Sequence, residues 1–219
     1  MHIVIQNGWE AARKNFGPGL LLQGLALTLV LLYYFFPPVH NILLQVPVLQ
    51  QRMGIGFPIV VTAFFGGFIP FLFQLIRREI PKGMLLPNLL FMLGFWALLG
   101  LAVNLLYAGQ AVMFGDQPNV ATVVKKVCFD QFVFSPFFSA PFSAIAMHWK
   151  RHRFSFRETR ADFSRTMFTV EIPSVLIALW AVWMPTMAIV YCLPLALQFP
   201  LFNIVLCFWS LLLTAMDSK

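Results

Sequence analysis

Residues 172–216 read IPSVLIALWAVWMPTMAIVYCLPLALQFPLFNIVLCFWSLLLTAM, and these 45 positions contain no Asp, Glu, Lys or Arg. A helix that crosses a lipid bilayer needs about 20 mainly apolar residues, so this stretch is long enough for two crossings. We expect the turn between them near residues 191–194, where Pro194 follows Tyr191. The backbone inside lipid is satisfied only in helices and closed barrels, and a continuous apolar run favours helices over alternating strands.

The rest of the chain repeats this pattern. Acidic and basic residues are also absent from residues 15–51, 53–76, 83–115 and 131–149. The 219 residues are 60% hydrophobic and 11% charged, whereas a soluble domain carries about 25% charged residues. The sequence therefore predicts a single domain, 1–219, that is all-α and forms a polytopic transmembrane bundle. The predicted spans are six in number, about 18–36, 55–76, 88–114, 127–149, 171–191 and 195–215.

The basic residues indicate the orientation of these spans. Twelve of the fifteen fall on one predicted side: Arg13, Lys14, Arg77, Arg78, Lys82, Lys150, Arg151, Arg153, Arg157, Arg160, Arg165 and Lys219. The other side holds Arg52, Lys125 and Lys126. Because basic residues collect on the cytoplasmic side, both termini are expected there or in an organelle matrix. The net charge of +7 is then a topology signal, and we expect no nucleic-acid partner.

The loop 150–165 has features of its own. Ser155 and Glu158 have the spacing of a capping box, which opens a helix. The pattern predicts an amphipathic helix over 156–167 that lies in the headgroup region, in contact with anionic lipid. A solvated loop is the alternative interpretation.

Small and polar residues recur every four positions in three of the predicted spans, and residues four apart share a helix face. The stripes are Thr62, Gly66, Pro70 and Gln74; Gly100, Asn104 and Ala108; and Gln131, Ser135, Ser139 and Ser143. In one interpretation they are dry helix–helix contacts. In the other they converge on a path that water can enter.

Prolines and one acid extend the second interpretation. Pro136 and Pro141 each remove a backbone hydrogen bond, freeing the carbonyls of Phe132 and Phe137, so they predict kinks or hinges. Asp130 lies four residues after Lys126 and can pair with it or form a charged pore mouth. The candidate pore or gate residues are Thr62, Gln74, Asn104, Lys126, Asp130, Gln131, Ser135, Pro136 and Ser139.

Catalytic and metal-binding motifs are absent from the sequence, so we expect no enzyme, cofactor or metal. His148 and His152 have the helical spacing of two metal ligands, but they lie among basic residues that would repel a cation. The cysteines, Cys128, Cys192 and Cys207, are interpreted as packing residues.

The block Lys125-Lys126-x-x-x-Asp130-Gln131-x-x-Phe134-x-Pro136 resembles the hallmark of the Mpv-seventeen and peroxisomal-membrane-protein-twenty-two family, which is K-x-x-x-D-Q followed by a proline. Weaker matches to the family's patterns fall at Gly94, Gly100, Asn104, Tyr107, Trp180, Trp183, Pro185, Pro194, Trp209, Leu213 and Thr214. The chain departs from the family at Pro70, Leu101, Asn104, Leu106 and Gln198, which replace an aspartate, a proline, a histidine, a tryptophan and an arginine.

This resemblance implies a small protein of an organelle membrane, either the mitochondrial inner membrane or the peroxisome, or of a bacterial inner membrane. It also implies a channel-like, non-catalytic protein for small solutes. A scaffold that binds partner proteins is the alternative function, and an intramembrane enzyme is a less favoured one. Six short spans form a narrow bundle, so assembly of several copies into a homo-oligomer is an alternative to a single chain.

Overall fold

The computed structural model describes residues 16–115, 119–190 and 195–217, and the regular secondary structure within these ranges is helical. Three helical segments are long and apolar enough to cross a membrane: Gly56–Ile76, Leu85–Phe114 and Met167–Met184. A fourth is added if the bent pair Gly24–Phe35 and Pro37–Met53 counts as one broken span. The all-α prediction is confirmed, with three to four candidate spans by length and composition. The expected turn at 191–194 and the charges Arg13, Lys14 and Lys219 lie outside the described residues.

The first described helix, α2 (Phe16–Phe35), ends at the predicted proline pair. Phe36 takes an extended conformation (φ −128°, ψ 97°), because the ring of a following proline disfavours helical backbone at the residue before it. Beyond it, α3 (Pro37–Leu43) and α4 (Gln45–Met53) continue at 105° to α2.

The next two long helices pack closely against each other. The first is continuous through α5 (Gly56–Thr62), η1 (Ala63–Phe68) and α6 (Ile69–Ile76), and the second is α7 (Leu85–Phe114). A Cβ atom added to Gly100 would lie 2.6 Å from the Pro58 carbonyl oxygen, and one added to Gly67 would lie 2.8 Å from that of Met92. The two helices are therefore antiparallel and touch backbone to backbone, which is the dry contact that the small-residue stripes predict.

A third long helix follows as α8 (Val120–Phe129), η2 (Asp130–Ser139) and α9 (Ala140–Arg151). The chain then forms α10 (Phe156–Ala161), η3 (Met167–Glu171), α11 (Ile172–Val190) and α12 (Leu195–Asp217). The Ser155 side chain accepts a hydrogen bond from the Glu158 N–H, so this residue caps α10 as predicted. The predicted helix over 156–167 is shorter in the structure, because α10 ends at Ala161 and Met167 is buried in the core.

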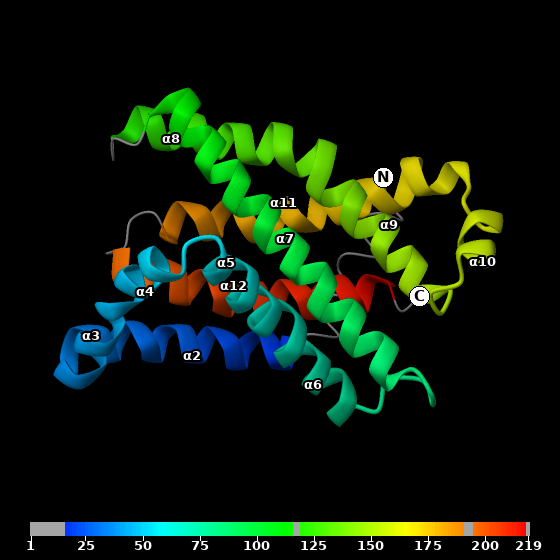
Figure 1. Cartoon of the computed structure of the whole chain (residues 1–219), viewed down its shortest axis with the longest axis horizontal. Helices are drawn as coiled ribbons and strands as arrows, with labels where there is room; N and C mark the ends of the chain where they lie inside the picture. Colours follow the sequence, from blue (N-terminus) through cyan, green and yellow to red (C-terminus); the bar gives the residue numbers. More distant parts are fainter. Residues whose placement is uncertain (1–15, 116–118, 191–194, 218–219) are drawn as a thin grey trace.

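The helices form two crossed layers (Figure 1). In one layer α2, α12 and α11 lie side by side, and in the other the α5–α6 helix and α7 cross them obliquely; the η2–α9 helix also runs obliquely and packs against α11. The main core joins buried side chains of α7, α9, η3, α11 and α12 around Trp96 and Met92. Large apolar side chains such as Phe137 and Val112 are exposed on the outside, which suits a surface covered by lipid.

The segments η1, η2 and η3 are π-helical. Pro136 lies within η2, and a proline follows two residues after the end of η1 and of η3. In a π-helix the N–H of residue i bonds to the carbonyl of residue i−5 rather than i−4. The nitrogen of Pro70 carries no hydrogen, so it cannot donate to the carbonyl of Phe65 at i−5 or to that of Gly66 at i−4. Both are satisfied from α12, because Cys207 donates to Phe65 and Ser210 donates to Gly66.

The same replacement occurs at Pro136. The sequence pointed to Phe132 as the residue with the freed carbonyl, but the π-helical register moves that role to Gln131. The indole N–H of Trp180 in α11 donates to the Gln131 carbonyl at 2.8 Å. The two kinked helices are therefore tied to their neighbours by specific side-chain donors, which satisfies the backbone without water.

Candidate functional site

A cavity of about 660 Å³ lies between α5, α7, η2, α11 and α12. Each of these elements contributes side chains to its wall, so the cavity belongs to the bundle as a whole. It does not extend to Gly66 and Gly67 of η1, where Gly67 lies against the backbone of Met92 in α7.

Most of the candidate pore residues meet at this cavity. The lining includes Thr62, Asn104, Lys126, Asp130, Gln131, Ser135 and Ser139. They come from three different helices, so the three polar stripes converge in the structure. The π-helical form of η2 helps to align Gln131, Ser135 and Ser139, because a wider helix keeps residues four apart closer to one line than a 3.6-residue turn does.

Two candidates lie elsewhere. Pro136 is partly buried but does not line the cavity. Gln74 is buried at the opposite end of the bundle, where its Oε1 accepts hydrogen bonds from Asn88 Nδ2 and Lys150 Nζ, both at 3.3 Å. The stripe of the second predicted span thus serves the cavity at Thr62 and a separate polar cluster at Gln74.

Aromatic residues form a large part of the wall, and the sequence analysis did not assign them to the site. Trp96, Trp183, Trp209, Phe199 and Phe202 line the cavity from α7, α11 and α12. The signal available in the sequence was the clustering of tryptophans in the last two predicted spans, which is equally typical of interfacial anchors. The cavity therefore combines a polar strip with an apolar and aromatic wall, as ligand pockets in proteins do.

The cavity extends along only part of the bundle. On α7 its lining runs from Trp96 to Ala111, which is about 22 Å at 1.5 Å per residue. The hydrocarbon core of a bilayer is about 30 Å thick, so the cavity covers some two-thirds of it. At one end lie exposed lining residues, including Gln50 and Tyr107, and at the other lie the buried rings of Trp96 and Trp209.

Two residues that line the cavity, Gln131 and Trp96, carry buried polar atoms. Gln131 is 2% exposed, and its Nε2 donates to Asp130 Oδ2 at 3.4 Å. Its Oε1 and the Nε1 of Trp96 are buried, and neither has a protein hydrogen-bond partner among the described residues. A buried donor or acceptor without a partner costs about 1–3 kcal/mol, so these two atoms are unusual features of the residues around the cavity.

The entrance carries charge of both signs. Lys126 and Asp130 both line the cavity, on successive turns of one helix. Gln110 Nε2 donates to the Lys126 carbonyl at 3.0 Å, which fixes the end of α7 against α8. The charged residues Lys126 and Asp130 of the K-x-x-x-D-Q block are thus part of the cavity wall.

Comparison with family models, curated proteins and solved structures gave no match to this chain. The functional argument therefore rests on the geometry described above.

Proposed function

We propose that this chain is a non-catalytic, channel-like integral membrane protein that admits small polar solutes through the cavity. The observation that carries the proposal is the convergence of three polar stripes on one cavity inside an otherwise apolar helical bundle. Polar residues inside a membrane protein are costly to bury, and they face a bundle interior or a water-filled path.

The dimensions suit small solutes. A volume of about 660 Å³ falls in the range of sites for small molecules. Because the lining stops at Trp96, the cavity in this conformation is a vestibule open at one end. Passage across the membrane then requires a movement of the aromatic floor, and the π-helical segments at Pro70 and Pro136 are the places where the helices can bend.

The proposal includes six spans with both termini on one side. Each of the six predicted spans coincides with a described helix or helical run. The basic loops around Arg77 and Lys150 lie at one end of the bundle, since Lys150 bonds to Gln74 near the end of α6. The start of α2 and the end of α12 point toward that same end, while α4 and α8 lie at the other (Figure 1). This arrangement supports an even number of crossings.

The resemblance to the Mpv-seventeen and peroxisomal-membrane-protein-twenty-two family is part of the same proposal. Its support is positional, because Lys126, Asp130 and Gln131 of the hallmark block all line the cavity. By that resemblance the membrane is a bacterial inner membrane, the mitochondrial inner membrane or the peroxisomal membrane. The basic end of the bundle faces the cytoplasm or matrix, where the exposed Arg157 and Phe156 of α10 contact anionic lipid.

Cysteine accessibility tests the cavity directly. In a chain without native cysteines, Ser139→Cys places a thiol on the cavity wall, and we expect a water-soluble thiol reagent to modify it. Ser143→Cys is the matched control, since Ser143 lies one turn further along the same stripe, is 1% exposed and does not line the cavity. Equal protection of both cysteines in a folded protein would contradict a water-filled vestibule.

Conductance tests transport. Purified protein in planar bilayers is expected to conduct, and Asp130→Asn should lower its preference for cations because a negative charge at the entrance is removed. Glu79→Gln is the control, because Glu79 pairs with Arg77 at 3.7 Å at the opposite end of the bundle. A bilayer that stays silent at all voltages with folded wild-type protein would contradict a channel.

The close glycine contacts favour the alternative, a scaffold that holds partner proteins or a second copy of itself. Gly66 lies so near Trp96 that an added Cβ would come within 2.6 Å of its ring. A rigid, dry bundle of this kind can hold partner proteins without transporting a solute. Protection of Ser139→Cys from the reagent combined with a silent bilayer would favour the scaffold over a channel.

A further inference from the structure

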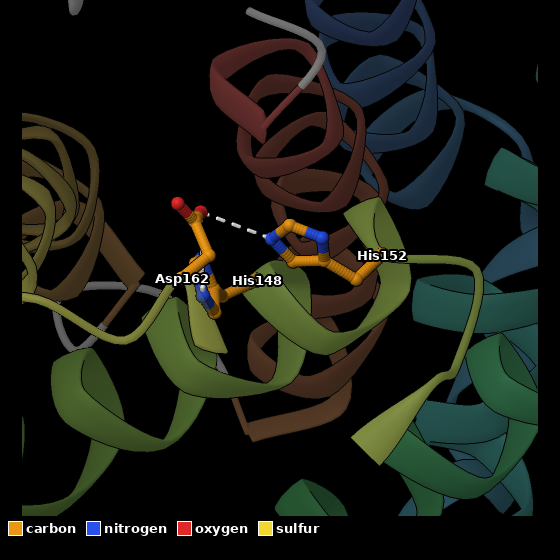
Figure 2. Close-up of side chains that lie close together, drawn as sticks. All are labelled: His148, His152 and Asp162. Atoms are coloured by element: carbon orange, nitrogen blue, oxygen red, sulfur yellow. Dashed lines mark hydrogen bonds and ion pairs between the residues drawn. The ribbon is translucent and has the colours of Figure 1, made fainter. Parts of the chain in front are cut away.

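Three side chains at the basic end of the bundle converge on one point. His148 and His152 lie on successive turns at the end of α9, and Asp162 follows α10. Figure 2 shows the two imidazoles and the carboxylate turned toward one another. One potential ligand atom from each residue lies within 4.8 Å of the others.

The fold brings Asp162 to the two histidines through a tight reversal of the chain. Arg153 and Phe154 adopt left-handed backbone conformations, with φ of 50° and 65°. Ser155 then caps α10. This helix is only six residues long, and it brings Asp162 back against α9. Non-glycine residues keep this left-handed conformation only where the surrounding structure holds them in it.

The distances suit a first-row divalent metal. Asp162 Oδ2 lies 3.0 Å from His152 Nε2 and 3.9 Å from His148 Nε2. Two ligands bonded to a tetrahedral zinc ion at 2.0–2.1 Å lie about 3.3 Å apart, so small side-chain rotations bring these atoms to ligand positions. Two imidazoles and one carboxylate, with a fourth position open to water, form a set that zinc and similar ions prefer.

A second observation points independently to a ligand. The His148 side chain is 2% exposed, yet its Nε2 is buried without a hydrogen-bond partner among the described residues. This atom faces Asp162, but 3.9 Å is too long for a hydrogen bond. A buried imidazole nitrogen left without a partner in this way is accounted for by a metal ion between it and the carboxylate.

The local charge also differs from what the sequence suggests. The sequence argument against a metal rested on the many basic residues of the loop 150–165. In the structure Arg151 is paired with Glu171 at 2.9 Å, so its charge is balanced beside the site. With Asp162 added, the immediate surroundings hold two carboxylates for one guanidinium.

Binding replaces the hydrogen bond of 3.0 Å between His152 Nε2 and Asp162 Oδ2 by two metal bonds, and it changes the tautomer of His148. Arg151 donates a hydrogen bond to His148 Nδ1, which places the hydrogen of a neutral His148 on Nε2. A metal at Nε2 displaces that hydrogen to Nδ1, so Arg151 must turn away from Nδ1 and keep its pairing with Glu171, whose Oε2 lies 3.8 Å from Nδ1. Glu171 is thereby placed to orient the ligand, as carboxylates behind metal-bound histidines do.

We propose that His148 Nε2, His152 Nε2 and Asp162 Oδ2 bind a zinc-class divalent cation, which fastens the loop 152–162 to the end of α9. Asp162 is 63% exposed and His152 is 22% exposed, so an ion can enter from the water or headgroup side. The site is remote from the cavity and does not depend on the channel proposal.

The test is zinc binding by the full-length chain in detergent, with any affinity tag removed and the protein first treated with a chelator. We expect one zinc ion per chain. His152→Gln and Asp162→Asn should each weaken zinc binding by about 100-fold or more, because losing a residue that bonds to the metal costs at least the 10–100-fold seen when a residue that only hydrogen-bonds to a ligand is lost.

Matched controls are His40→Gln and Glu158→Gln, a histidine on another helix and an acid in the same loop, and both should bind zinc as the wild type does. X-ray absorption of the zinc-loaded wild type should show two imidazole nitrogens and an oxygen at about 2.0–2.2 Å. A wild-type chain that binds no zinc, or site variants that bind it as tightly as the controls, would overturn the proposal.

Discussion

Replacing Gly100 by alanine tests the contact on which the bundle depends. The new Cβ would lie 2.6 Å from the Pro58 carbonyl oxygen, 2.7 Å from Thr62 Oγ1 and 2.9 Å from Thr62 Cβ. The first of these atoms is backbone, so rotation of a side chain cannot relieve the contact, and α5 must move away from α7. Overpacking of this kind costs about 1–3 kcal/mol in the free energy of unfolding.

Two other glycines on α7 supply the comparison. An added Cβ meets nothing within 4 Å at Gly94 or Gly109. Alanine there should leave the free energy of unfolding unchanged or raise it by up to about 1 kcal/mol, because alanine is the better helix former. Both variants gain the same helix propensity, so only the overpacking differs, and we expect Gly100→Ala to be less stable than Gly109→Ala by about 1–3 kcal/mol.

The assay is reversible unfolding in mixed micelles followed by circular dichroism, with the three alanine variants measured side by side. Adding Thr62→Ala to Gly100→Ala should recover only part of the loss, since the Pro58 carbonyl stays in place. If Gly100→Ala unfolds together with Gly94→Ala and Gly109→Ala, the close packing of α5 on α7 is wrong.

Two further predictions concern the donors that satisfy freed carbonyls. Ser210→Ala removes the hydroxyl that donates to Gly66, and it should lower the free energy of unfolding in the same micelle assay by about 1–3 kcal/mol. Trp180→Phe keeps an aromatic ring but removes the donor to Gln131, with a loss of similar size. That loss should shrink when Pro136→Ala is also present, because the new backbone N–H can reach the same carbonyl. A double-mutant cycle should show a coupling of about 1 kcal/mol, and additive effects would argue against the π-helical register of η2.

The sequence was informative about elements and faces. Uncharged runs located the helices, the proline pair after Phe36 located the end of α2, and a period of four located the faces that meet. Ser155 was identified as a helix cap because its hydroxyl satisfies a backbone donor three residues on, which is a local effect.

Long-range partners were beyond the sequence. The bond between Trp180 and the Gln131 carbonyl joins residues 49 apart in the chain, and no local pattern distinguishes this tryptophan from an interfacial anchor. Gln74 shares its stripe with Thr62, yet the packing of α9 gives it Lys150 as a partner instead of a place in the cavity. Asp162 joins the histidines only because the backbone reverses at Arg153 and Phe154.

Because η2 is π-helical, the number of residues in it determines how the helix beyond it is rotated. If a residue were removed between Asp130 and Ser139 and the π-helical winding were kept, everything beyond it would rotate by roughly one residue's turn, about 100° in an α-helix. Lys150 would swing away from Gln74, and the two histidines would turn from Asp162, while the side chains nearer the entrance stayed in place. Such a deletion would therefore break the contacts at the basic end of the bundle and leave the residues at the other end in place.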